Sequence, residues 1–319
     1  MSGITDQIRS ACARVAARAR FVSIDDAVLE EWVEALPGSP PLPSAPDPAH
    51  RLQGEPDTTL AYVVTLDAIN FGSGWFPDLR KRPGMSGYFT IASCLSEHFA
   101  RHGAWDAVAL RRLDADRCAE LFEQRGNDPV RELMALFARA LGELGSWLGK
   151  RHGGSFAKAI EAAEGSAERL VALLCEMPLY RDVARYAGFE VPLYKRAQLT
   201  ASDLAAAFGG RGPGRFGDLD RLTIFADNLV PHVLRRDGVL RYDPFLASRI
   251  DRHEALDPGS PEEVEIRAVA LHAVERAVAA LRERGVATSA RQLDTLLWNR
   301  GQRPEIKAHP RHRSRCACY

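Results

Sequence analysis

The chain has 319 residues, and its 42 basic side chains are balanced by 42 acidic ones, so the formal net charge at pH 7 is zero. This balance argues against a broad nucleic-acid-binding surface, which requires an excess of Lys and Arg. No apolar run approaches the roughly 18–20 residues of a membrane span, and the Arg-rich N-terminus lacks the apolar segment of a secretory signal. The six scattered cysteines indicate reduced thiols in a cytoplasmic protein.

Helical patterns dominate the first half of the chain. Amphipathic spacing predicts helices at residues 5–21 and 25–36, followed by a proline-rich connector at 37–48. An apolar stretch then ends in a glycine-containing loop at 70–77. Further helices are expected at residues 86–102, 114–122, 129–147, 155–163 and 166–175, and each of the last two opens with a serine N-cap.

The second half contains the one predicted exception to helix. At residues 180–194, two short apolar runs flank a glycine and predict a short β-hairpin. Helical patterns return at residues 195–208, 260–285 and 289–299. We therefore predict an all-α, mainly helical fold and a single domain over residues 1–319. The glycine-rich loop at 209–217 is the candidate seam between two lobes, and it lacks the spacing of a phosphate-binding loop.

Asp227 is the most unusual charged residue in the sequence. A strongly apolar run precedes it, and apolar residues at helical spacing follow it from Leu229 to Leu234. A carboxylate at the edge of a buried face is costly unless it is paired or used in catalysis. The local pattern alone favours an N-cap that accepts N–H groups of the next turn. The alternative is a catalytic carboxylate.

Two helix starts are candidate anion sites. Lys195 and Arg196 place two cations where the helix dipole disfavours them, so they either bind an anion, form an ion pair or lie in a solvated turn. Ser260 is the expected N-cap of a second helix, with Pro261 at N1 and Glu263 at N3 completing a capping box. Free N–H groups at this N-terminus can bind an anion, although Glu263 competes for them.

Asp294 and Trp298 lie four residues apart on one predicted helix face. An indole beside a carboxylate suits a flat, hydrogen-bonding heterocycle. The structural alternative is a core Trp beside a surface Asp, and the spacing alone favours this alternative.

The C-terminal segment contains His309 and His312 followed by Cys316 and Cys318. These residue types can bind zinc, but the Cys-x-Cys spacing is tighter than the usual gap of about two to four residues. A docked basic tail is the favoured interpretation, and we expect no metal.

Several of these segments together resemble the queuosine salvage proteins, the queuosine 5′-phosphate N-glycosylase/hydrolases. The similarity covers about residues 60–319, and the segments occur in the order of that family. They are Asn70-Phe71, Ser86-Gly87-Tyr88-Phe89, Gly154-Ser155-Phe156, Tyr180-Arg181-Asp182-Val183-Ala184, Tyr194-Lys195-Arg196-Ala197-Gln198, Thr223-Ile224-Phe225-Ala226-Asp227, Glu263-Val264-Glu265-Ile266-Arg267, Leu293-Asp294 with Leu297-Trp298, and His312-Arg313-Ser314-Arg315-Cys316 with Tyr319.

The resemblance implies a mainly helical fold similar to helix-hairpin-helix DNA glycosylases, which place a catalytic aspartate shortly before a comparable helix. It implies hydrolysis of queuosine 5′-monophosphate to queuine and ribose 5-phosphate, a step in salvage of a 7-deazaguanine base used in tRNA modification. Asp227 is then the catalytic residue, and Asp294 accepts the N–H donors of the base. The remaining expected substrate-binding residues are Tyr88, Phe225 and Trp298 for stacking, Lys195 and Arg196 for the phosphate, Ser260 as the second anion site, and Ser86 and Thr223 within the matching segments.

Two other functions remain alternatives from the sequence. A DNA-repair glycosylase fits the same helical pattern, although it needs a basic DNA-facing surface. A non-enzymatic helical scaffold is the other. For the favoured function we expect a monomer that binds a small nucleotide, with no metal or organic cofactor and no nucleic-acid or membrane partner.

Overall fold

The computed structural model describes residues 3–36 and 54–319, so the predicted proline-rich connector at 37–48 lies outside the described residues. Helices make up 59% of the structure and strands 5%, which confirms the mainly helical class. No helix within the described ranges has the length and apolar character needed to cross a membrane.

The chain divides into two compact units, each assembled from separate segments. The first contains residues 3–36, Asp182–Lys195 and Asp220–Arg315, and the second contains residues 54–181, Arg196–Leu219 and Cys316–Tyr319. The predicted seam at 209–217 lies inside the second unit, just before one of the points where the chain passes between units. The single-domain description stays a prediction.

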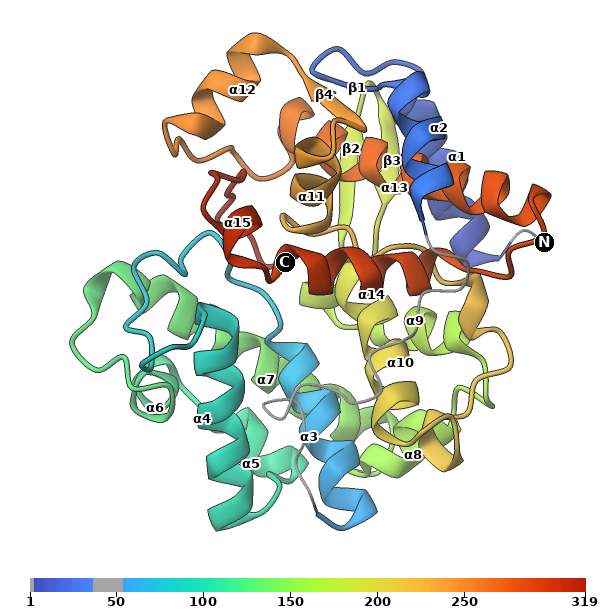
Figure 1. Cartoon of the computed structure of the whole chain (residues 1–319). Coiled ribbons are helices and arrows are strands. Elements are labelled where there is room, and N and C mark those ends of the chain that lie inside the picture. Colours follow the sequence, from blue (N-terminus) through green and yellow to red (C-terminus); the bar gives the residue numbers. More distant parts are fainter. Residues whose placement is uncertain (1–2, 37–53) are drawn as a thin grey trace. The chain divides into compact units, whose positions relative to one another are not determined.

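The first unit contains α1 (Ile4–Ala16), β1 (Val22–Ile24), α2 (Asp26–Ala35), β2 (Val183–Tyr186), β3 (Phe189–Pro192), α11 (Val230–Arg236), β4 (Leu240–Tyr242), α12 (Pro244–Asp251), α13 (Pro261–Glu283), α14 (Ala290–Gly301) and α15 (Pro304–Lys307). Its central element is α13, which contacts α1, α2, α11, α14, β1 and β2 (Figure 1). Most of this helix is buried, including the charged residues Glu263, Glu265 and Arg267.

The start of α13 differs in one detail from the predicted capping box. Ser260 is the N-cap as predicted, and its Oγ accepts the N–H of Glu263 at 3.4 Å. The Glu263 carboxylate accepts the N–H of Gly259 at 3.2 Å, one residue before the N-cap. The helix start is therefore capped, with Glu263 reaching past Ser260.

The predicted β-hairpin is confirmed, since β2 pairs antiparallel with β3 and Val183 faces Pro192. A second two-stranded sheet was not predicted: β1 pairs with β4, with Val22 opposite Tyr242. These strands have three residues each, which is too short to show alternation. The prediction of helix to residue 21 was wrong because α1 ends at Ala16.

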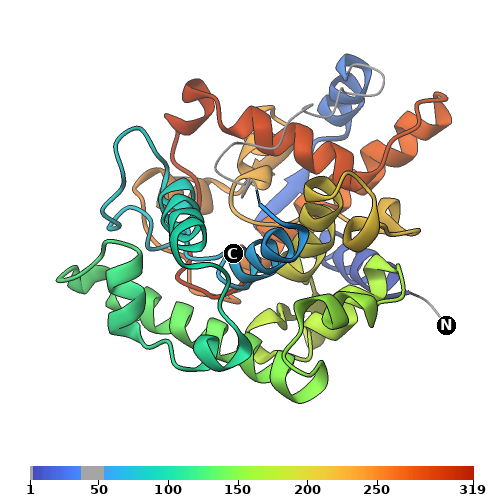
Figure 2. The same cartoon turned by 90° about the horizontal axis from the view of Figure 1, so that it is seen from below.

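The second unit contains α3 (Pro56–Ala68), α4 (Gly87–His102), α5 (Ala107–Arg111), α6 (Ala115–Leu121), α7 (Arg131–Arg151), α8 (Phe156–Glu161), α9 (Ala167–Leu174) and nearly all of α10 (Lys195–Ala207). The long α7 contacts α3, α5, α6 and α8, and Figure 2 shows the blue α3 beside the green helices. The predicted N-caps are confirmed: Ser155 accepts the N–H of Lys158 at 3.2 Å and Ser166 that of Arg169 at 3.1 Å.

Candidate active site

The segment from Leu222 to Leu234 in the first unit forms the centre of the candidate site. Every residue in it is buried except Asp227, which is partly exposed. The part before α11 is irregular, so its buried N–H and C=O groups lack the partners that a regular helix would supply. The segment therefore needs side-chain partners and leaves one carboxylate within reach of solvent.

Two charged side chains hold the backbone just before Asp227. Asp294 on α14 accepts the N–H of Phe225 through Oδ1 at 2.8 Å. Arg267 on α13 donates from Nε to the carbonyl of Ala226 at 2.9 Å. These bonds fix the peptide units that lead into Asp227, and they tie the segment to two longer helices.

The Asp227 side chain uses one oxygen for the backbone. Its Oδ1 accepts the N–H groups of Leu229 at 2.7 Å and Val230 at 3.2 Å. The prediction that Asp227 is the N-cap was wrong, because α11 begins at Val230 with Leu229 as its N-cap residue, and Asp227 instead holds the turn before the helix. Its Oδ2 has no hydrogen-bond partner among the residues that the structure describes. The carboxylate is thus held in one orientation with its second oxygen open to a water molecule or a substrate.

Arg267 itself lies in a buried network of charges. Its guanidinium donates to both oxygens of Asp182, at 3.1 and 2.6 Å, and to Glu263 at 3.4 Å. All three side chains are at most 4% exposed. Asp182 also accepts the N–H of Lys195 at 3.1 Å. A paired and bidentate guanidinium in this position sets the place of the Ala226 carbonyl.

The C-terminal segment runs beside Asp227. Asn228, the next residue, donates from Nδ2 to the carbonyl of His312 at 3.3 Å. The carbonyl of Arg313 accepts the N–H of Leu256 at 2.8 Å. The basic tail is docked on the first unit, as the favoured interpretation predicted. Within the described ranges, no group of three or more His, Cys, Asp or Glu side chains is placed to hold a metal ion.

Two buried histidines lie in this region. Burial lowers the pKa of His232 to about 4 and that of His312 to about 3, and nearby arginines add to both shifts. His232 Nε2 bonds to the carbonyl of Ile306 at 3.1 Å, so it must carry the proton. Both rings are therefore neutral near pH 7.

The other candidates of the first unit have assigned places. Thr223 is fully buried, and its hydroxyl donates to the carbonyl of Ile224 at 3.2 Å. Lys195 begins α10 and is 5% exposed. Ser260 is used in capping α13, and the partly exposed Trp298 lies one turn after Asp294 on α14. Their roles toward a substrate stay predictions.

Arg196 lies in the second unit and is 1% exposed. Its guanidinium donates to the carbonyls of Ala68, at 2.6 Å, and Leu179. The same group lies over the rings of Phe71 and Tyr180, 4.8 and 4.6 Å from their centroids. These contacts favour a structural role, and the expected contact between Arg196 and phosphate stays a prediction.

Ser86 and Tyr88 lie at the start of α4 in the same unit. Ser86 is the N-cap, and its Oγ accepts the N–H of Phe89 at 3.2 Å. Between them, Gly87 packs so tightly that a Cβ would lie 2.5 Å from Phe76. The half-buried Tyr88 has its ring centroid 5.5 Å from that of Phe89. The local fold therefore depends on a glycine at position 87.

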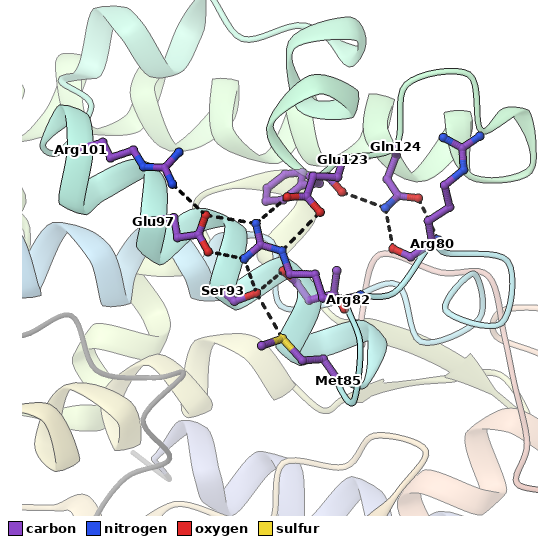
Figure 3. Close-up of polar contacts among 10 residues, drawn as sticks. Arg80, Arg82, Met85, Ser93, Glu97, Arg101, Glu123 and Gln124 are labelled. Atoms are coloured by element: carbon purple, nitrogen blue, oxygen red, sulfur yellow. Dashed lines mark hydrogen bonds and ion pairs between the residues drawn. The ribbon is translucent and has the colours of Figure 1, made fainter.

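The loop before Ser86 is held by the group that we name the Arg82 clamp, formed by Arg82, Ser93, Glu97 and Glu123 (Figure 3). Arg82 donates to Glu97 and Glu123 at 2.6 Å each, and to Ser93 at 3.1 Å. The two carboxylates raise the pKa of Arg82. The clamp holds the loop that leads to Ser86 against α4 and the end of α6.

Sequence reasoning assigned no role to Arg267, Asp182, Asn228 or Arg311. Arg267 and Asp182 lie inside segments that matched the family. An Arg within a largely buried helix and an Asp just before a strand are signals of a buried ion pair. Their partners are far apart in the sequence, so spacing alone could not connect them.

Comparison with known proteins agrees with the earlier resemblance. A family model described as "Queuosine salvage protein" matches residues 50–319. A protein of Sphaerobacter thermophilus is 39% identical over 311 residues, covering 96% of this chain and 95% of its own. Relatives from Dictyostelium discoideum and Mus musculus are 32% and 29% identical, covering 81% and 84% of this chain and 77% and 84% of their own. All three are named queuosine 5′-phosphate N-glycosylase/hydrolase.

Proposed function

This chain belongs to the queuosine salvage protein family, and we propose that it is the hydrolase that cleaves the N-glycosidic bond of queuosine 5′-phosphate. The products are queuine and ribose 5-phosphate. The observation that carries the proposal is the Asp227 carboxylate, held through Oδ1 and open at Oδ2 in an otherwise buried segment. The family assignment favours a free nucleotide as the substrate over DNA, and an enzyme over a scaffold.

Asp227 acts where positive charge develops. As the bond between ribose C1′ and the base nitrogen breaks, the sugar gains oxocarbenium character, which a fixed carboxylate stabilises. The open Oδ2 orients a water molecule. As the water oxygen bonds to C1′, Oδ2 accepts a proton from that water. The departing base takes up a proton at the nitrogen released from the sugar, so the hydroxyl and hydrogen of one water are divided between the products.

The base requires a different kind of assistance from an ordinary purine. Position 7 of a 7-deazapurine is carbon and cannot be protonated, so help for the leaving group must come from contacts at its other edges. Asp294 uses Oδ1 for the Phe225 N–H, and we propose that its carboxylate also accepts N–H donors of the base. Phe225 and Trp298 supply the expected aromatic surfaces.

The direct test is incubation of the purified protein with queuosine 5′-phosphate, with free queuine detected by mass spectrometry. We expect equimolar queuine and ribose 5-phosphate from the wild type, and release about 10²–10³-fold slower from Asp227→Asn. Asp220→Asn is the matched control, because Asp220 lies shortly before the Leu222–Leu234 segment and its side chain is 73% exposed. Intact nucleotide after incubation with the folded wild type would overturn the proposal.

A further inference from the structure

We infer that Arg311 binds the phosphate group of the substrate. This inference rests on the proposed function and assigns a residue to the anionic end of the nucleotide. The sequence had suggested Lys195 and Arg196 for this role.

The position of Arg311 is set by the docked C-terminal segment. The next residue, His312, accepts a hydrogen bond from Asn228, and Asn228 directly follows Asp227. Arg313 is held in turn by the N–H of Leu256. Two bonds of the backbone after Arg311 therefore bring it alongside the catalytic carboxylate, within one compact unit.

None of the residues that the structure describes accepts a hydrogen bond from the donors of Arg311. The residue is half-buried, and within the described ranges its guanidinium forms no hydrogen bond and no ion pair. Burial lowers the pKa of Arg311, while the charge of Asp227 acts in the opposite direction. A guanidinium has five N–H donors. An anionic ligand beside Asp227 would satisfy them.

The surrounding charges favour a dianion. The charge of Arg313 acts on Arg311, and Arg311 in turn lowers the pKa of the exposed Lys307. His232 and His312 are neutral near pH 7. Arg313 and Lys307 thus add positive charge around Arg311, and a phosphate monoester carries roughly −1.5 to −2 at pH 7. The planar guanidinium also matches the oxygens of a phosphate in a bidentate contact.

Arg196 contrasts with Arg311 in each of these respects. Its guanidinium is 1% exposed and donates to two backbone carbonyls. Replacing those carbonyls by a phosphate would leave them buried without donors, which is costly. Arg311 has no such bonds to give up among residues 3–36 and 54–319.

The test measures kcat/KM for queuosine 5′-phosphate and for the free nucleoside queuosine, together with calorimetric binding of ribose 5-phosphate. Arg311→Gln should lower kcat/KM for the nucleotide about 10- to 100-fold, weaken ribose 5-phosphate to a similar extent and leave the nucleoside unchanged. Arg311→Lys should recover part of the loss. Arg303→Gln is the control, because Arg303 is an exposed arginine at the start of α15, and it should leave all three quantities unchanged.

Equal losses on nucleotide and nucleoside would overturn the inference, because Arg311 would then act through Asp227. The same conclusion follows if Lys195→Ala, and not Arg311→Gln, shows the nucleotide-specific loss. Melting temperatures of all variants check that they are folded. If the wild type hydrolyses neither substrate, the proposed function fails, while calorimetry with ribose 5-phosphate still tests Arg311 by itself.

Discussion

Asp227 shows how one residue can combine a structural role with a proposed catalytic one. Asp227 is not the N-cap of α11, which is Leu229, but its Oδ1 accepts the N–H groups of Leu229 and Val230 and so holds the turn into the helix. Catalysis needs a negative charge that faces the reacting atoms, and Oδ2 is open for that purpose. The turn before α11 therefore holds the proposed catalytic group in place, and its structural role and its proposed catalytic role can be separated by substitution.

Asp227→Asn should abolish most of the activity without a loss of stability. The amide oxygen can still accept both N–H groups, while the missing charge should reduce kcat by about 10²–10³-fold. Asp227→Ala should lose activity to a similar extent and also about 1 kcal/mol of stability, because the N–H groups of Leu229 and Val230 lose their acceptor. Kinetics and urea unfolding on both variants check this. Near-normal activity of Asp227→Asn would contradict the catalytic assignment.

Asp294 allows a comparable separation of two roles. If the carboxylate only positions Phe225, Asp294→Asn should behave almost as the wild type, because an amide oxygen also accepts the N–H. If it also binds the base, both Asp294→Asn and Asp294→Ala should weaken queuine as a product inhibitor, with ribose 5-phosphate inhibiting as before. We expect the second result, since a buried carboxylate facing a guanine-like edge gains two N–H donors. Titration of queuine by calorimetry decides between them, and an unchanged dissociation constant would assign base recognition to another residue.

At the scale of elements, local signals predicted the helices well where they were strong. Ser86, Ser155 and Ser166 are N-caps as expected, because the cap is a contact between near neighbours in the sequence. The end of α1 was missed because its cause is distant: Glu265 on α13 accepts the N–H groups of Arg20, at 2.9 Å, and of the two residues that follow. Those bonds replace helical ones and direct the chain into β1.

The candidate site shows the same limit. Asp227 could be identified from its apolar surroundings and from the family-like segments around it. Arg267 could not be given a role, because its partners Asp182 and Ala226 are 85 and 41 positions away in the sequence. Arg311 was one of several cations in a basic tail, and only the structure shows that its donors remain unused beside Asp227.

The Arg82 clamp leads to a prediction about the loop before α4. Glu97 and Glu123 are about half exposed, so each ion pair alone contributes little, but together with Ser93 they hold one guanidinium. Arg82→Ala should raise the rate of tryptic cleavage after Arg80 and Lys81 about 5- to 30-fold, as for a loss of roughly 1–2 kcal/mol in local stability.

Native proteolysis with mass spectrometry of the fragments measures this rate. Arg101→Ala is the control, because Arg101 forms only a single exposed pair with Glu97, at 3.6 Å. If Arg82→Ala and Arg101→Ala are cleaved at the same rate as the wild type, the clamp has no role in holding the loop.

At the scale of the whole molecule, buried neutral histidines make stability depend on pH. The folded pKa values of His232 and His312, about 4 and about 3, lie below the ordinary value of 6.5. Between these limits the unfolded chain binds protons that the folded protein does not. The stability that the neutral His232 and His312 contribute to the folded protein is therefore fully present above pH 6.5, and it is lost as the pH falls toward their folded pKa values. Burial also lowers the pKa of His98, His152 and His272.

We expect the free energy of unfolding to fall between pH 6.5 and 5 with a slope that approaches about 1.4 kcal/mol per pH unit for each of His232 and His312. Most carboxylates titrate below this window, so the histidines dominate it. Urea unfolding at several pH values measures the slope. Asn at position 232 or 312 cannot take up a proton, so His232→Asn and His312→Asn should each flatten it, whereas the exposed His309→Asn should not. A wild-type stability that stays constant from pH 7.5 to about 5 would show that these imidazoles can be protonated without unfolding, and that the tail beside Asp227 opens at little cost.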